Sequence, residues 1–409
     1  MNGDATVLDP AAPTLASESW RRNDIVRWLL EDGWRTRTPE ALLSELCPRL
    51  IDAGVPADRV NLSVRLLHPQ VFSLVFIWQP GQPIKRLEGA YAILDEDRFR
   101  LSPLKDLSDG DGAVIRRRIT GPAASLDYPI LHDLAAEGFT DYLALGLPFS
   151  DGRHSAITLA TRAPGGFDAA HLALIDDAAP ALARVVEIMA LRHTSLTLMQ
   201  TYLGRQTGAR VLDGQIRRGD SDVIQAVIWF CDLRGSTRLA EAMNAACFLE
   251  TLNGYFDAMA GAVLDHGGEV LRYIGDAALA IFPYPAGDTE GADPAPARAA
   301  MDAARDAGAR MAALNAERLA ADLPPLGHGI GLHVGRVTYG NIGVQTRLEF
   351  TVIGAAANLA ARVEGLCKTL DEPVVVSAAF RERHPGPWRA LGRHALRGVD
   401  RPEAVYAPA

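Results

Sequence analysis

The stretch GGEVLRYIGDAALAIF, residues Gly267–Phe282, decides how the second half of the chain is expected to fold. Two segments with the length and apolar content of buried strands are joined at Gly275-Asp276, a pair typical of a tight hairpin turn. A carboxylate between two buried strands costs several kcal/mol if it is desolvated and unpaired. The pattern therefore predicts a cation close to Asp276.

The segments on either side of this hairpin predict the rest of the domain. A strand over Val223–Leu233 precedes it and leads through Arg234-Gly235-Ser236-Thr237 into one helix over residues 237–267. A loop and helix follow it, and then strands within Gly329–Gly343 and Leu348–Gly354 and an Ala-rich helix over Ala355–Leu366. The order strand, helix, two strands, helix, strand predicts an α+β fold with a ferredoxin-like (βαββαβ) core.

Two acidic residues are expected to meet in this core. The first strand can lie beside the hairpin, which brings Asp232, at the end of that strand, to Asp276. Two adjacent carboxylates raise each other's energetic cost unless a divalent ion lies between them, and ligands that are all oxygen suit Mg²⁺ or Mn²⁺ rather than zinc. Taken singly, an Asp after a strand is most often a helix cap and Gly-Asp in a hairpin is most often only a turn, so the combination carries the argument.

The segment that follows Asp232 predicts a phosphate site. Residues Gly235, Ser236 and Thr237 turn directly into a helix, so their backbone N–H groups are expected to be exposed at its N-terminus. Carboxylates beside such amides indicate a site for a metal–nucleoside triphosphate.

Four blocks in the same order resemble the class III adenylate/guanylate cyclase catalytic domain. They are FCDLRGST, GGEVLRYIGDAALAIF, IGLHVGRVTYGNIG and FTVIGAAANLAARVE, and the resemblance runs from about Val223 to Ala407. It implies that Asp232 and Asp276 hold two ions, Mg²⁺ or Mn²⁺, with the Leu233 carbonyl as a further ligand. It also implies that the backbone amides of Gly235, Ser236 and Thr237 hold phosphates.

The resemblance implies roles for three further side chains. Asn358 and Arg362 match the pair that supports the transition state, and their spacing of four places them on one helix face. Arg397 matches a basic residue of the closing segment, where it either reaches the triphosphate or is a surface arginine. The implied reaction is attack of the ribose 3′-oxygen on the α-phosphorus, with release of pyrophosphate.

The base-reading positions match Arg272 and Thr351. Arginine can donate to N1 of adenine and threonine can accept from its amino group, whereas N1–H and N2–H₂ of guanine require acceptors. ATP is therefore the expected substrate and cyclic AMP the product. Two alternatives stay open: a guanylate cyclase, because arginine can donate to O6 and N7 of guanine, and a non-catalytic nucleotide-binding relic, because Arg272 and Ala355 depart from the family pattern.

In this family the metal acids and the Asn/Arg pair of one site come from different subunits. One chain that carries both sets therefore implies a homodimer with two shared sites, which the preceding residues would regulate. The catalytic domain is predicted over residues 223–409 and a helical linker and connector over residues 186–222.

Residues 20–185 are predicted to form a separate α+β domain. Helical periodicity opens it, strand-like runs follow, and Gly138–Ile175 resembles a GAF-type sensory domain. The resemblance implies either a small-molecule ligand or a role in dimerisation alone. In the closing helix Pro180 is expected to cause a kink or a restart, and the part beyond Val186 is expected to pair with a partner copy. Residues 1–19 are expected to be a loose tail.

Composition excludes several classes of protein. A formal charge of −9, from 41 basic and 50 acidic residues, argues against a nucleic-acid binder. The four cysteines form no CxxC pair, which argues against a zinc cluster or a disulfide framework. No signal-peptide pattern opens the chain, and apolar runs such as Ala226–Cys231 are far shorter than the ~20 residues of a membrane helix. We therefore expect a cytoplasmic protein without a membrane partner.

Overall fold

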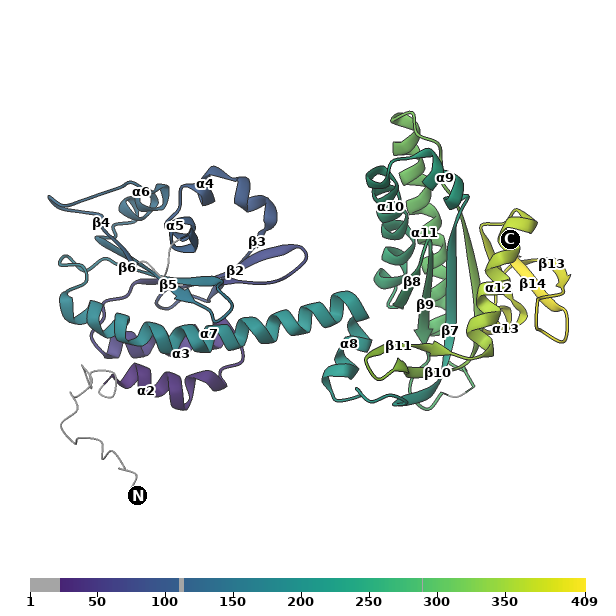
Figure 1. The fold of residues 1–409 in the computed structure, drawn as a ribbon, viewed down its shortest axis with the longest axis horizontal. Coiled ribbons are helices and arrows are strands. Elements are labelled where there is room, and N and C mark those ends of the chain that lie inside the picture. Colours follow the sequence, from purple (N-terminus) through teal and green to yellow (C-terminus); the bar gives the residue numbers. More distant parts are fainter. Residues whose placement is uncertain (1–22, 110–113, 289) are drawn as a thin grey trace, which may run out of the picture. The chain divides into compact units, whose positions relative to one another are not determined.

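The structure, a computed structural model, describes residues 23–109, 114–288 and 290–409 (Figure 1). The chain divides into two compact units, Met1–Thr197 and Leu198–Ala409. The predicted tail, residues 1–19, lies outside the described residues. The predicted linker, residues 186–222, is divided between the two units.

The N-terminal unit contains an antiparallel sheet in the order β3-β2-β1-β6-β5-β4. Its strands are β1 (Arg59–Arg65), β2 (Val71–Trp78), β3 (Lys85–Ala90), β4 (Val114–Arg118), β5 (Asp141–Pro148) and β6 (His154–Thr161). Its helices are α2 (Asp24–Glu31), η1 (Gly33–Arg35), α3 (Pro39–Asp52), η2 (Tyr91–Asp95), α4 (Asp97–Arg100), α5 (Pro103–Asp109), α6 (Pro129–Ala136) and α7 (Ala169–Leu203). This arrangement confirms the α+β prediction, while the GAF-type assignment stays a prediction.

Helices α2, α3 and α7 cover one face of this sheet and α4, α5 and α6 lie over the other (Figure 1). The first face presents branched aliphatic side chains such as Leu62 and Leu143, which are buried against the long helices. The helix α7 does not restart at Pro180, and its packing within the unit continues past Val186 to Ala190. The expected pairing of its later part with a partner copy stays a prediction.

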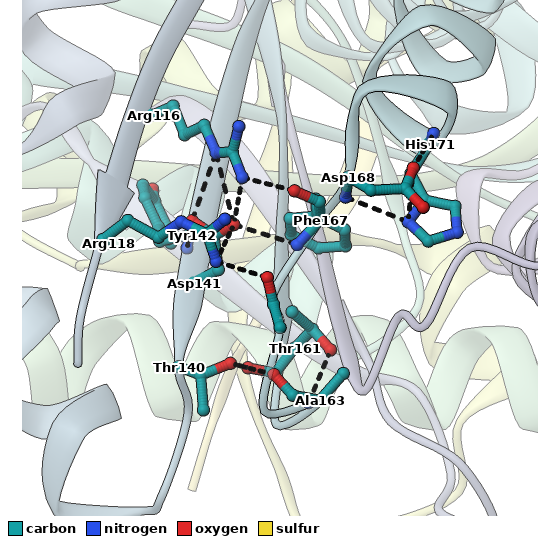
Figure 2. Close-up of polar contacts among 11 residues, drawn as sticks. Arg116, Arg118, Thr140, Asp141, Tyr142, Thr161, Ala163, Phe167, Asp168 and His171 are labelled. Atoms are coloured by element: carbon teal, nitrogen blue, oxygen red, sulfur yellow. Dashed lines mark hydrogen bonds and ion pairs between the residues drawn. The ribbon is translucent and has the colours of Figure 1, made fainter. Parts of the chain in front are cut away.

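A buried ion pair ties the sheet of this unit to the segment before α7 (Figure 2). The fully buried carboxylate of Asp141, at the start of β5, lies 2.7 Å from Nη2 of Arg116 on β4. The backbone N–H of Phe167 donates to the same oxygen at 3.0 Å. The buried charge is tolerated because it is hydrogen-bonded and paired, with Arg118 as a second cation 3.5 Å from the same oxygen.

The second unit is built on a larger sheet in the order β13-β14-β12-β10-β7-β9-β8, with β11 paired to the end of β10. Its strands are β7 (Ser221–Arg234), β8 (Glu269–Ile274), β9 (Ala277–Pro283), β10 (Gly327–Val344), β11 (Arg347–Ile353), β12 (Val374–Ser377), β13 (Trp388–His394) and β14 (Glu403–Pro408). Its helices are α8 (Arg205–Leu212), α9 (Ser236–Ala242), α10 (Ala245–Asp265), α11 (Ala295–Ala320), α12 (Ala355–Leu370) and α13 (Ala378–Arg383).

The central four strands of this sheet confirm the predicted ferredoxin-like core. Strands β7, β8, β9 and β10, with α10 and α11 between them in the chain, lie in the order β10-β7-β9-β8. Helices α10 and α11 pack on one face, around Trp229 and Met259, and α12 packs on the other through Ala356 and Ala360. Alternation along β7 sends Trp229 and Ile228 to opposite faces, and both are fully buried.

The single helix predicted over residues 237–267 is instead two helices, α9 and α10. Asn244 separates them because its side chain caps α10, accepting a hydrogen bond at 2.9 Å from the N–H of Cys247. The break shortens α9 to seven residues directly after the end of β7.

The connector predicted over residues 201–222 contains the helix α8, which is anchored to the sheet. Glu269, at the start of β8, is buried and accepts hydrogen bonds from the N–H and the hydroxyl of Thr207, at 2.8 and 2.9 Å. Tyr339 on β10 donates to its second oxygen at 2.8 Å. Since both carboxylate oxygens are satisfied, α8 is held firmly against the strand that carries Arg272.

None of the helices in the described part of the chain combines the length and the apolar character needed to cross a membrane.

Candidate active site

The carboxyls of Asp232 and Asp276 lie side by side at one end of the sheet. Asp232 is opposite Ala277 in the last pair of the β7–β9 register, and Asp276 is the turn residue just before Ala277. Oδ1 of Asp232 is buried without a hydrogen-bond partner. Burial and, secondarily, the neighbouring Asp276 raise the pKa of Asp232 to about 6. The pair therefore has an unmet requirement for positive charge.

The donors at this end of the sheet fit a hard divalent cation. Leu233, whose carbonyl is the predicted third ligand, lies one residue past the last β7–β9 pair and hence beside the turn that holds Asp276. All of these donors are oxygen atoms, the ligand type of Mg²⁺ and Mn²⁺. Within the described residues there is no group of three or more His, Cys, Asp or Glu side chains that could hold a metal. The two carboxylates and main-chain oxygen are thus the donors available.

Glu364 is a third acid close to this pair, and the sequence reasoning missed it. Burial and then the charge of Asp232 raise its pKa to about 7. Its carboxyl occupies the space over Gly329, where an added Cβ would lie 2.3 Å from Oε1, and Gly329 is the β10 residue opposite Asp232. Gly329, a strand glycine that faces the acidic helix residue Glu364, was the signal that could have indicated this third acid. Glu364 places α12 in electrostatic contact with the acids of its own chain.

The turn after β7 leads directly into α9, and phosphate binding by its backbone N–H groups stays a prediction. Gly235 precedes α9 with φ of 75°, a left-handed conformation that glycine adopts without strain. No side chain caps the helix start, so the first amides of Ser236 and Thr237 have no side-chain acceptor. Arg234 points away from this turn and donates to the carbonyls of Cys367 and Glu372, at 2.8 and 2.7 Å.

Asn358 and Arg362 line a cavity of about 480 Å³ whose wall is formed by α12 together with His333 and Arg336 of β10. Gly398 and Val399 line it as well, so the turn that carries the exposed Arg397 lies at its edge. The described residues that line this cavity do not include Asp232 or Asp276. The sequence-predicted residues therefore form two separate groups in one chain, the acids with the glycine turn and the Asn/Arg pair with the closing turn.

His333 forms part of the same cavity wall and is a satisfied interior histidine. Its Nδ1 is 2.8 Å from the hydroxyl of Ser377, and burial lowers its pKa to about 4. The ring is therefore neutral near pH 7 and contributes shape to the cavity rather than charge.

Arg272 and Thr351, the predicted base readers, are neighbours. A register shift between Val270 and Arg272 aims Arg272 across the sheet, where its Nη2 donates to Oγ1 of Thr351 at 3.4 Å. Glu349, two residues earlier on the same strand, lies 3.1 Å from Nε of Arg272. Glu349 was missed, although alternation along the strand places it on the same face as Thr351. Its carboxylate adds a charged acceptor beside the hydroxyl of Thr351.

Residues 221–380 match the family model of the adenylate and guanylate cyclase catalytic domain. Similar curated proteins include the uncharacterized protein Rv1319c of Mycobacterium tuberculosis, 32% identical over 215 residues. That alignment covers 52% of this chain and 38% of the relative. An uncharacterized protein of Mycobacterium bovis, Mb1352c, is 34% identical over 216 residues, which are 52% of this chain and 37% of the relative. The chain thus spans little more than a third of the length of these relatives.

Similar solved structures cover the same part of the chain. The adenylyl cyclase CyaB from P. aeruginosa is 28% identical, with 46% of this chain and 94% of that chain covered and a TM-score of 0.42. The guanylyl cyclase Cya2 is 27% identical, with 46% of this chain and 92% of that chain covered and a TM-score of 0.40.

Proposed function

We propose, from the premise that residues 221–380 form a class III adenylate/guanylate cyclase catalytic domain, that the chain is an adenylate cyclase. It converts ATP to 3′,5′-cyclic AMP and pyrophosphate at sites shared by two copies, under the control of its N-terminal unit. The observation that carries the proposal is the pair Asp232 and Asp276, which is partly buried and has no cation partner among the described residues. Asp232 also lies four residues before Ser236, where the helix α9 starts without a side-chain cap.

Asp232 and Asp276 would hold two divalent ions, Mg²⁺ or Mn²⁺, with the carbonyl of Leu233. When bound, such ions lower the pKa of the ribose 3′-hydroxyl and neutralise charge on the triphosphate. The protein residues do the positioning. The N–H groups after Gly235 bind phosphate oxygens and align the α-phosphorus with the 3′-oxygen, which attacks as its proton leaves and the bond to pyrophosphate breaks.

Asn358 and Arg362 would complete the site of the partner copy. Asn358 orients the ribose and Arg362 meets the charge that develops on the α-phosphate, with Arg397 close to the triphosphate. The separation of these side chains from Asp232 and Asp276 within one chain supports this assignment, because a single copy then holds two halves of different sites. A homodimer with two shared sites follows.

ATP is the proposed substrate because Arg272 and Thr351 offer the donor and the acceptor that adenine requires. Guanylate cyclase is the second candidate, and one observation favours it. The carboxylate of Glu349, 3.1 Å from Arg272, could accept from N1–H and N2–H₂ of guanine. The family description itself includes both nucleotides.

The test is an assay of the purified full chain with ATP or GTP and Mg²⁺ or Mn²⁺, with cyclic product separated by chromatography. We expect cyclic AMP from ATP, and no product from Asp276→Asn with either ion. Exposed Asp400→Asn, on the turn after Arg397, is the matched control and should retain activity. Product only from GTP would select guanylate cyclase. No product from either nucleotide would support the non-catalytic alternative and refute the enzyme.

A further inference from the structure

The N-terminal sheet has one face that is unlike a packed core. Toward α4, α5 and α6 it presents small and polar side chains, namely Asn61, Thr158, Tyr142, Ala144, Ala156 and Ala160. Asn61 is opposite Thr158, and Ala160 lies between Arg59 and Tyr142 in the strand register. The opposite face carries branched aliphatic residues under the long helices. Small side chains under helices leave space that the protein itself does not fill.

That space is a cavity of about 200 Å³ between the sheet and the short helices. Its helix side is apolar and includes Phe99, Leu104, Ile130 and Leu134. A smaller cavity of about 70 Å³ shares Phe99 and Leu104 with it. An apolar cavity of about 150 Å³ is enough for a benzene ring, so this one accepts a single substituted ring and is too small for a nucleotide.

The sheet side of the cavity supplies polar groups in a fixed order. Oδ1 of Asn61 is buried without a hydrogen-bond partner. Thr158 and Tyr142 place hydroxyls on the same wall of the cavity, and Asn61 contributes the acceptor without a partner. Arg59, two residues along the same strand, also lines the cavity, and in the part of the chain that the structure describes no carboxylate forms an ion pair with it. An unpartnered buried acceptor costs roughly 1–3 kcal/mol, which a ligand donor would recover.

The charged side chains Glu96 and Arg98 also line the cavity and are exposed, so they lie at its mouth. Arg98 is 3.3 Å from Asp133, which offsets its charge. Arg59 is therefore the cation available to an anion inside. Two residues along a strand span about 6.8 Å, which is close to the distance between para substituents across a benzene ring.

We propose that this cavity is a binding site for a small aromatic acid, a single ring with a carboxylate directed at Arg59 and a hydroxyl donor directed at Asn61. The ring lies between the apolar helix residues and the alanines of the sheet, and the hydroxyl replaces the missing partner of Asn61. Binding is independent of the reaction in the second unit, so its test does not depend on the catalytic proposal.

The test uses calorimetric titration of the full chain with 4-hydroxybenzoate. Benzoate lacks the donor and phenol lacks the anion, and each should bind about tenfold more weakly, as expected for one lost hydrogen bond or ion pair. Ala160→Leu fills the cavity and should abolish binding. The matched control Ala136→Leu, at an exposed position of α6, should leave binding unchanged.

Asn61→Leu keeps the shape of the side chain and removes the acceptor. It should raise the melting temperature of the ligand-free protein, because a buried polar atom without a partner is replaced by an apolar one. It should also weaken the binding of 4-hydroxybenzoate about tenfold. This variant decides the question alone if Ala160→Leu does not fold. Absence of saturable binding at millimolar 4-hydroxybenzoate, or equal binding by wild type and Asn61→Leu, would overturn the proposal.

Discussion

At the scale of single residues, the second unit is organised around an arrangement that is unfavourable without a cation. Asp232 and Asp276 place two carboxyls together in a partly buried turn, and Glu364 adds a third acid behind them. Each acid could be a cap or a packing residue by itself. Their joint position is better explained by function, because stability alone would favour replacing one carboxylate with a neutral group.

Asp232→Asn should therefore stabilise the metal-free protein and abolish cyclic nucleotide formation. The pKa of Asp232 rises from 3.8 to about 6 on folding, so the folded state keeps a proton that the unfolded chain releases. Stability from this group is present below pH 3.8 and is lost as the pH rises to about 6. Above that pH the free energy of unfolding of the variant should exceed that of wild type by on the order of 1 kcal/mol. This value is small because Asp232 is half exposed and water screens its charge.

Urea denaturation of wild type and Asp232→Asn at several pH values, without divalent ions, measures this effect. The comparison uses the difference between the two proteins, so that buried histidines such as His328 and His333, whose pKa values are lowered to about 4, cancel. A difference in the free energy of unfolding that does not change between pH 4 and pH 7 would contradict the account of this pair.

Arg272→Glu should shift the preference between nucleotides toward GTP, because it replaces the donor to adenine with an acceptor for guanine. The ratio of kcat/KM for ATP and GTP measures the shift, and we expect a change of roughly tenfold or more. Arg347→Glu makes the same change at an exposed position on β11 and should leave the ratio unaltered. An unchanged ratio in Arg272→Glu would mean that the base lies elsewhere.

At the scale of secondary structure elements, β10 and α12 approach each other backbone to backbone. A Cβ on Gly331 would lie 2.4 Å from the backbone nitrogen of Glu364 and 2.6 Å from the carbonyl oxygen of Ala360. The helix that carries Asn358 and Arg362 therefore depends on a glycine in the strand beneath it. Backbone atoms cannot move aside as a flexible side chain can.

Gly331→Ala should consequently lower the free energy of unfolding by about 3 kcal/mol. Gly365→Ala is the matched control, since its added Cβ meets no atom within 4 Å and alanine favours a helix interior by about 1 kcal/mol over glycine. Chemical denaturation of the two variants should give changes of opposite sign. A tolerated Gly331→Ala would show that α12 does not pack as closely as described.

The sequence predicted the elements of the second unit better than the connections between them. The continuous apolar run in Val223–Leu233, the Gly275-Asp276 turn and the order of the elements were enough for the ferredoxin-like core. The break at Asn244 was missed because apolar spacing continues across it and only the cap ends the helix. The contact of α8 with Glu269 was missed because it joins residues 62 positions apart, which local patterns do not report.

The candidate site shows the same limit. Motif residues such as Asp232 and Asp276 could be predicted because strand order alone brings them together. Glu349 and Glu364 were missed because no motif includes them: Glu349 meets Arg272 through a register shift in β8, and Glu364 lies over a glycine of β10. In the N-terminal unit, no motif indicated the cavity beside Asn61, since its residues are spread over several strands and helices.

At the scale of the whole molecule, the proposed function implies that one chain holds two incomplete sites. The acids and the glycine turn lie at one end of the sheet, while Asn358 and Arg362 line a cavity without them. Helix α7 supports assembly as well, because Ile188, Leu191 and Leu196 are exposed beyond its most tightly packed part. Two copies that share their sites would give the N-terminal units control of the reaction through the geometry of the pair.

Mixing two inactive variants tests this central claim most directly. Asp232→Ala lacks a metal ligand and Arg362→Ala lacks the transition-state cation, so each homodimer should be inactive. After subunit exchange, about half of the dimers are mixed and each has one intact site of two, which predicts about a quarter of wild-type activity. Demonstrated exchange between differently tagged copies, with no return of cyclic product, would contradict the shared site.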